Sequence, residues 1–406
     1  MHRPVCMLAL FVLLCILCFH GQRVQFRPPS YVVEKMRYPN RKLDKDFEKI
    51  DGDKMKQAVP EKYLMFLKTH KTAGTSLMNM IERYAESHNL TIALPNGVNA
   101  DQFDYPHKFT EELVLPLFKP EQDYNVICHH MRFNSFEVEK IMPKHKTKYV
   151  TILREPGRLF ESIFDYYYEQ VVFFHKVPTT MPVDINEWLD MAPTLYGYAN
   201  PENEDKLWFI GKNMEFFDFG FNPLNETDEY IGAAIKKIES QFDLVLISDY
   251  FLESEVLFKD LMNWEWKDMR TLKLNSRIKV NDGPLPEQLR KKIRKWNKAD
   301  AALFDHFNAT FWRKIQDYNL EKMRVDTEAL KRLNEEFEKE CVTANATLDD
   351  DNLLYNPGQH LTLKGYSLKK DSKQHWECSR ATMGTLQYSE KLRDEYNEKW
   401  RQIETS

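Results

Sequence analysis

The stretch FLKTHKTAGTSL, residues 66–77, decides how the fold of this chain is interpreted. It begins at the end of a short apolar run, residues 63–67, which is typical of a strand buried on both faces. After it, apolar side chains recur at helical spacing and share one face: Leu77, Met80, Ile81 and Tyr84. The sequence therefore predicts a buried strand, a turn of small residues and a helix.

The turn between this strand and this helix is suited to an anion. A helix N-terminus offers backbone N–H groups without helical partners and the positive end of the helix dipole. The hydroxyls of Thr72, Thr75 and Ser76 add donors, and Lys71 adds a positive charge. The order is not that of a Walker A loop, because the lysine precedes Gly74. The turn therefore predicts a site for a phosphate or a sulfate, although Lys71 alone is equally typical of a solvated loop.

A second junction of the same kind lies further along the chain. Residues 149–153 read YVTIL, and their β-branched side chains predict another strand. Arg154 follows it, and Pro156 suits the start of an aromatic helix that we expect over residues 159–174. Ser162 lies eight residues after Arg154.

The remaining periodicity defines the fold class. Apolar runs predict strands at residues 124–128 and 243–247, and apolar stripes predict four helices, at residues 251–264, 284–297, 299–320 and 321–340. Strands that alternate with helices predict an α/β fold with a mostly parallel sheet flanked by helices. The later helices predict a helical cap at the C-terminal end.

Both junctions resemble known sequence motifs. Residues 71–76, KTAGTS, resemble the 5′-phosphosulfate loop of the sulfotransferases that use 3′-phosphoadenosine 5′-phosphosulfate (PAPS). Arg154 and Ser162 resemble the pair that binds the 3′-phosphate in that superfamily. The phrases FLKTHKTAGTS and ILREPGRLFES, together with FNATFW at residues 307–312, are similar to the galactose 3-O-sulfotransferase family. The resemblance covers roughly residues 63–396.

The resemblance implies a P-loop-like sulfotransferase fold and a set of site residues. PAPS is the implied sulfuryl donor, with no metal, and the implied acceptor is the 3-hydroxyl of a galactose in a glycolipid or glycoprotein. Lys71 is implied to stabilise the leaving group, as a catalytic residue. The residues implied to bind the donor are Lys71, Thr72, Ala73, Gly74, Thr75, Ser76, Arg154 and Ser162.

An acceptor hydroxyl needs a base. His129 and His130 follow the predicted strand at residues 124–128, where related uronyl 2-O-sulfotransferases carry a catalytic histidine. We predict that His130 is the base, with His129 second and His70, beside Lys71, third. The alternative is a histidine packed at the end of a strand. No further ligand at metal-site spacing accompanies this histidine pair.

The N-terminus predicts entry into the secretory pathway. Residues 5–19 are apolar and uncharged, with Arg3 before them and Arg23 after. We expect a cytosolic tail at residues 1–4, a signal anchor at 5–20, a lumenal stem at 21–60 and a sulfotransferase domain at 61–406. A cleaved signal peptide is the alternative. The expected location is the Golgi membrane, as a single-pass type II protein whose catalytic domain is lumenal.

Sequons and cysteines agree with a lumenal location. Four Asn-x-Thr sequons begin at Asn89, Asn225, Asn308 and Asn345. Beyond the apolar segment lie three cysteines, so at least one is free or pairs between chains. Cys341 and Cys378 flank a polar excursion, and we predict that they pair, which leaves Cys128.

Charge and motif order limit the rival functions. The net charge is -5 and the pI about 6.2, which disfavours a nucleic-acid binder. The absence of a Walker A order disfavours a kinase. Two alternatives remain open: PAPS-dependent transfer to another glycan, such as a uronic acid in a proteoglycan, and a non-catalytic glycan-binding protein on the same fold. The sequence predicts no oligomeric state.

Overall fold

The structure is a computed structural model that describes residues 59–98, 100–119, 121–168, 170–171, 174, 184–197, 208–274, 283–343, 366–372 and 375–405. At its centre, four strands form a parallel sheet in the order β2-β1-β3-β4. The strands are β1 (Leu64–Leu67), β2 (Val126–Ile127), β3 (Lys148–Leu153) and β4 (Leu244–Ile247). All four were predicted from the sequence, although β2 is shorter than the apolar run that predicted it.

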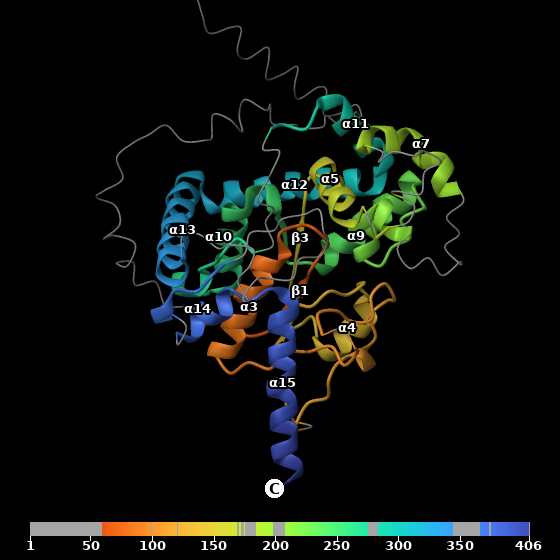
Figure 1. The fold of residues 1–406 in the computed structure, drawn as a ribbon. Helices are drawn as coiled ribbons and strands as arrows, with labels where there is room; N and C mark the ends of the chain where they lie inside the picture. The colour runs from red at the N-terminus through yellow and green to blue at the C-terminus, as the bar shows by residue number, and fades with distance from the viewer. Residues whose placement is uncertain are drawn as a thin grey trace, which may run out of the picture. The chain divides into compact units, whose positions relative to one another are not determined.

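Burial explains why these strands are parallel and central. Every strand residue except Lys148 is buried. Both faces of the sheet are therefore covered, as a parallel sheet requires. Figure 1 shows β1 and β3 enclosed among the helices. The carboxyl ends of β1 and β3 lie side by side, because Leu67 is in register with Thr151. This register brings the two motif-bearing junctions to one edge of the sheet.

Most of the described chain is helical. Before β4 lie α3 (Gly74–Ser87), α4 (Ser135–Ile141), α5 (Pro156–Tyr167), α7 (Ile185–Gly197), α8 (Met214–Asp218) and α9 (Asp228–Gln241). After β4 lie α10 (Phe251–Met262), α11 (Glu287–Trp296), α12 (Lys298–Tyr318), α13 (Leu320–Cys341), α14 (Trp376–Ala381) and α15 (Thr385–Glu404). The four helices predicted after β4 are confirmed as α10 to α13, with ends that differ by at most three residues.

The aromatic helix after β3 is shorter than predicted. Pro156 lies in the first turn of α5 and the Glu155 carboxylate accepts a hydrogen bond from Arg158 N–H, which caps the helix. The helix ends at Tyr167 rather than Phe174. Beyond it the chain turns, and Phe174 packs on Trp188 of α7 with ring centroids 5.1 Å apart.

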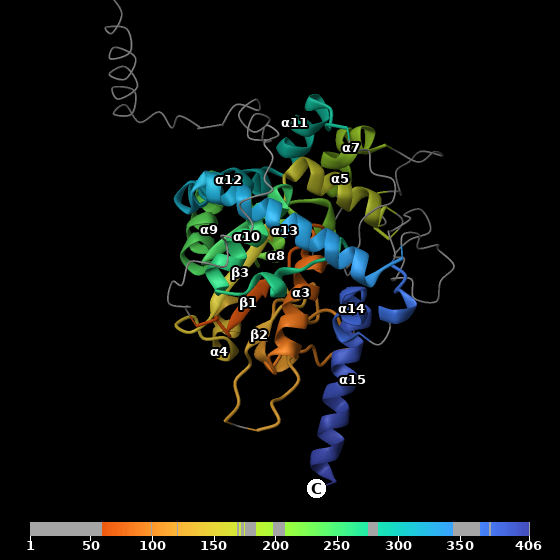
Figure 2. The same cartoon turned by 90° about the vertical axis from the view of Figure 1, so that its left-hand side faces the viewer.

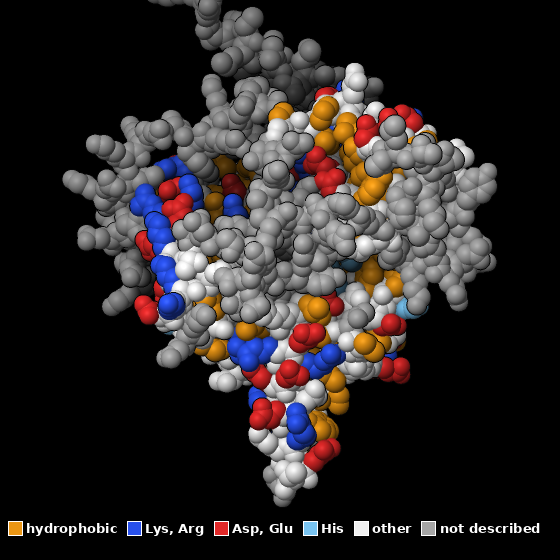
Figure 3. Space-filling model, viewed as in Figure 1, with side chains coloured by type: hydrophobic (Ala, Val, Ile, Leu, Met, Phe, Trp, Pro, Cys, Tyr) orange, Lys and Arg blue, Asp and Glu red, His pale blue; other side chains and the backbone are white. Residues whose placement is uncertain are grey.

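The C-terminal cap is fastened by a disulfide. Cys341 at the end of α13 is bonded to Cys378 in α14, so the predicted pairing is confirmed, and Cys128 is a buried free thiol. The last helix, α15, begins beside α3 and extends beyond the other described elements in two perpendicular views (Figures 1 and 2). On the face in Figure 3, charged and hydrophobic side chains lie next to each other along this projecting part.

Several sequence predictions fall outside the described residues. The predicted tail and anchor, nearly all of the stem and the sequon at Asn345 lie there. Among the described residues, no helix has both the length and the apolar character to cross a bilayer.

Candidate functional site

The site is built on the loop between β1 and α3. Lys71 and Ala73 adopt the left-handed backbone conformation, with φ of 58° and 64°. Ala73 precedes α3 and offers no capping side chain. As a result, the backbone N–H groups of Thr72, Ala73, Gly74 and Thr75 donate to no acceptor in the described part of the chain. Consecutive free N–H groups at a helix N-terminus fit an anion.

Two of the predicted hydroxyl donors are turned inward. The Thr72 hydroxyl donates to the Thr69 carbonyl oxygen at 3.1 Å. The Ser76 hydroxyl donates to the Leu272 carbonyl oxygen at 2.9 Å and accepts the N–H of Leu274 at 3.1 Å. These side chains hold the loop in shape. The backbone N–H of Thr72 remains available to a ligand, whereas that of Ser76 donates to the Ala73 carbonyl oxygen at 3.2 Å. Thr75 is partly exposed.

Lys68 lies beneath the loop rather than at the surface. Its ammonium group donates to the Thr385 hydroxyl at 3.1 Å, and the Thr385 hydroxyl lies 3.5 Å from that of Thr75. Burial lowers the pKa of Lys68. At Gly74 an added Cβ would lie 3.0 Å from Cγ of Lys68, so the lysine side chain would have to shift to make room for a larger residue. The first turn of α15 thus supports the loop from behind.

Arg154 joins the two junctions. It follows β3, its guanidinium donates to the Lys71 carbonyl oxygen at 2.9 Å, and its backbone N–H donates to the Glu215 carboxylate at 2.7 Å. Ser162 lies in the second turn of α5 and is buried. The structure therefore brings the predicted 3′-phosphate residue Arg154 into contact with the predicted phosphosulfate loop.

The side chain of Lys71 reaches across to α5. Its ammonium nitrogen lies 3.3 Å from the centre of the Tyr166 ring. A lysine over an aromatic face is held by the attraction between its charge and the ring. Tyr166 is a site neighbour within the predicted aromatic helix that no sequence motif singled out.

The three candidate histidines have different environments. His129 is fully buried, and its Nε2 lies 3.0 Å from the Ser389 hydroxyl. Burial, with a smaller effect of Lys68, lowers the pKa of His129 to about 3. His130 is partly exposed and stacks on His70, with ring centroids 4.3 Å apart. Burial, then Lys68 and His70, hold the pKa of His130 well below its usual value. His130 is therefore neutral near pH 7.

A buried carboxylate orients His70. Asp218, at the end of α8, accepts the His70 backbone N–H at 2.9 Å and lies 3.0 Å from His70 Nδ1. It also accepts the Tyr105 hydroxyl at 2.6 Å. A fully buried acceptor on Nδ1 fixes the ring, as in the Asp-His pairs of hydrolases. Sequence reasoning missed Asp218 and Tyr105, because neither belongs to a motif and both are far from His70 in the chain.

One buried cluster has ligand types that metals use. Glu82, Cys128 and His129 each bring a ligand atom within 4.8 Å of the others. The positive charge of Lys68 acts on all three groups, which disfavours a cation there. Burial raises the pKa of Glu82 well above its usual range. The expected absence of a metal from the reaction remains a prediction.

The chain is similar to known proteins over most of its length. A family model described as galactose-3-O-sulfotransferase matches residues 2–396. A galactosylceramide sulfotransferase of Bos taurus is 37% identical over 339 residues, which cover 81% of this chain and 77% of the relative. The Homo sapiens galactosylceramide sulfotransferase is 36% identical, with coverage of 82% and 78%. Galactose-3-O-sulfotransferase 3 of Bos taurus is 33% identical, with coverage of 80% and 77%. The chain belongs to the galactose-3-O-sulfotransferase family.

Proposed function

We propose that this protein transfers a sulfuryl group from PAPS to the 3-hydroxyl of a galactose in a glycolipid or a glycoprotein. The observation that carries the proposal is the loop after β1, where four consecutive backbone N–H groups are free and the Arg154 guanidinium is bonded to the Lys71 carbonyl. An anion-binding loop joined to an arginine suits a ligand with two separate phosphate-type groups.

The chain's own residues hold the donor and stabilise charge. PAPS supplies the sulfuryl group, bonded to a phosphate that leaves. The N–H groups of residues 72–75 bind the 5′-phosphosulfate, and Arg154 with Ser162 binds the 3′-phosphate. Lys71 carries an ammonium group on the same loop, where it stabilises the negative charge that develops on the leaving oxygen. Tyr166 keeps that ammonium group at the junction between the loop and α5.

His130 is the proposed base, and His70 is its competitor. His130 is partly exposed and neutral, as a general base must be before it takes a proton, and its lowered pKa makes it a weaker base than a free histidine. His70 lies against it and is oriented by Asp218. His129 is disfavoured because its Nε2 is engaged inside the protein.

Three variants distinguish the two histidines. If His130 is the base, His130→Ala removes turnover while Asp218→Asn changes it little. If His70 is the base, Asp218→Asn removes turnover nearly as far as His70→Ala does, since the amide no longer fixes the ring.

The proposed location is the Golgi membrane, with the catalytic domain in the lumen. Support comes from the apolar segment at residues 5–19, the four sequons and the Cys341–Cys378 disulfide, since disulfides persist in oxidising compartments. The apolar segment is the proposed uncleaved type II anchor.

The test uses the full-length chain, expressed in cells and solubilised in detergent. It is incubated with sulfur-labelled PAPS and four acceptors: galactosylceramide, lactosylceramide, N-acetyllactosamine and heparan. Label on a galactose 3-hydroxyl, lost in Lys71→Ala, is the expected result. Label on heparan alone would show that the acceptor is a uronic acid and not galactose. Binding of adenosine 3′,5′-bisphosphate without transfer to any of the four would contradict the proposed acceptor.

A further inference from the structure

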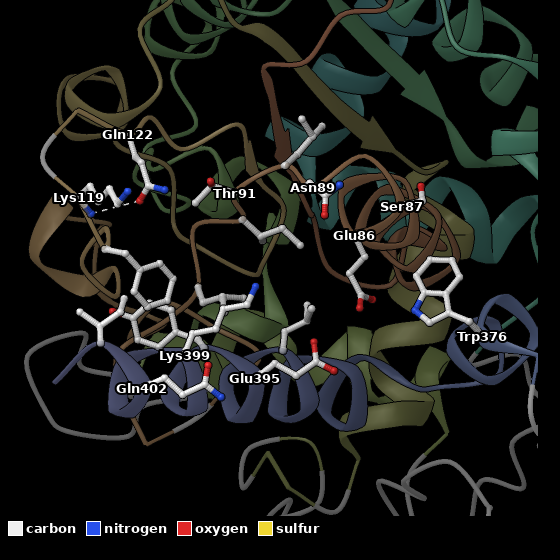
Figure 4. Close-up of a pocket in the computed structure, with 17 residues that line it drawn as sticks. Glu86, Ser87, Asn89, Thr91, Lys119, Gln122, Trp376, Glu395, Lys399 and Gln402 are labelled. Atoms are coloured by element: carbon white, nitrogen blue, oxygen red, sulfur yellow. Dashed lines mark hydrogen bonds between the residues drawn. The ribbon is translucent and has the colours of Figure 1, made fainter. Parts of the chain in front are cut away.

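A groove lies far from the donor site, between the end of α3 and the helix α15. It has a volume of 720 Å³, and its lining includes Asn89, Thr91, Phe118, Trp376, Tyr396 and Ile403. Figure 4 shows α15 along one side, with Asn89 and Thr91 across from it. Because α3 has 14 residues, its two ends are about 20 Å apart. The groove is therefore separate from the loop at the start of α3.

A sequon opens into this groove. Asn89 directly follows the end of α3 in a left-handed conformation, with φ of 52°, as is common for asparagine after a helix. Its backbone N–H donates to the Glu86 carbonyl oxygen at 3.2 Å. Its side chain is exposed, and the carboxamide makes no hydrogen bond with another described residue. The nitrogen that a glycan would occupy is therefore free and borders the groove.

We propose that Asn89 carries an N-linked glycan whose first sugars lie in this groove. The proposal rests on the lumenal location given under the proposed function. In the modification, Asn89 Nδ2 bonds to C1 of a lipid-diphosphate-linked oligosaccharide. The C1–O bond to the lipid diphosphate breaks, the lipid diphosphate leaves with the bonding electrons, and the amide loses one proton.

The chemistry of the groove matches a sugar. A pyranose ring has an apolar face that packs on aromatic side chains, and hydroxyls that bond to polar groups. The groove offers the rings of Trp376 and Tyr396, and the polar groups of Gln122 and Lys399. Trp376 and Ile403 are 40% and 52% exposed, which is high for large apolar side chains. A glycan tethered at Asn89 would cover them at high effective concentration.

A second sequon provides a matched comparison. Asn225 lies before α9 and is not among the groove residues. Its carboxamide oxygen accepts the Thr227 N–H at 3.3 Å and hydroxyl at 3.0 Å. A glycan at Asn225 would therefore start outside the groove.

Occupancy is tested first, by glycopeptide mass spectrometry on the full-length chain made in secretory cells. We expect a glycan at Asn89, its loss in Asn89→Gln, and its retention in Thr91→Ser, which keeps the sequon. If Asn89 is unmodified in a chain that is modified at Asn225, this inference is overturned but the proposed lumenal location is not. If no sequon in the chain carries a glycan, both this inference and the proposed lumenal location are overturned.

Placement in the groove is tested by glycosidase release from the native protein. We expect release from Asn89 to be at least about tenfold slower than from Asn225, and the two rates to become equal after denaturation. Trp376→Ala should abolish the difference. Ile403→Ser, at the exposed end of α15, is a second variant that should reduce it without touching α14. Equal native rates for the two sites would show that the glycan does not lie in the groove.

Discussion

Replacing Arg154 by alanine should separate two roles that the structure gives to one side chain. Its guanidinium already donates to the Lys71 carbonyl, and under the proposed function it also binds the 3′-phosphate. A hydrogen bond to a charged group contributes about 1.5–3 kcal/mol, so two bonds to a phosphate contribute about 3–6 kcal/mol. The bond to the Lys71 carbonyl is also charge-assisted, but it stabilises the loop and does not contact the nucleotide, so only part of its contribution affects nucleotide binding.

These magnitudes predict ligand-specific losses. A change of 1.4 kcal/mol in binding free energy corresponds to a tenfold change in affinity. Arg154→Ala should therefore lower the affinity for adenosine 3′,5′-bisphosphate by roughly 10²- to 10⁴-fold. Adenosine 5′-monophosphate lacks the 3′-phosphate, so its affinity should fall by less than about tenfold. Titration calorimetry with both ligands measures the two effects on the same protein.

A matched variant separates loop support from phosphate binding. Arg154→Gln keeps an N–H donor for the Lys71 carbonyl but removes the positive charge, so it should behave like Arg154→Ala toward the bisphosphate. The reasoning is refuted if Arg154→Ala weakens both nucleotides equally. In that case Arg154 acts by holding the loop, and the 3′-phosphate lies elsewhere.

Three further predictions concern turnover and stability. His130→Ala should lower turnover at least about tenfold while the affinity for adenosine 3′,5′-bisphosphate stays within about twofold; a matching loss of affinity would show that His130 is not the base. Replacing Cys341 and Cys378 together by serine should lower the free energy of unfolding by about 4 kcal/mol, because the disulfide closes a 37-residue separation. Denaturant unfolding measures this, and an unchanged midpoint would contradict it. Burial raises the pKa of Glu255 from 4.5 to about 8. The folded state therefore holds a proton that the unfolded chain releases, so stability should fall as pH rises from about 4.5 to about 8. Glu255→Gln should flatten this slope in melts across that pH range, and an equally steep slope would exclude Glu255 as its source.

The sequence by itself determined the strands of the sheet and the junctions that carry the motifs, whereas the strand order β2-β1-β3-β4 came from the tertiary structure. Runs of adjacent apolar residues define β1, β3 and β4, and such runs are local, so they can be read without knowing the rest of the chain. The helices after β4 were predictable for the same reason, since each has its own apolar stripe. The two motifs also placed Arg154 and the loop of residues 71–76 at strand ends, which parallel pairing then brought together.

The tertiary structure decided which side chains face a ligand. Asp218 reaches His70 from 148 residues away, and Thr385 reaches Lys68 from 317 residues away. No local pattern encodes such contacts, because they depend on how α8 and α15 pack on the loop. Packing also turned the hydroxyl of Ser76 inward, where the buried carbonyl of residue 272 requires a donor. The sequence thus determines which residues gather at the edge of the sheet. The packing of distant helices decides which of them hold the loop and which face the ligand.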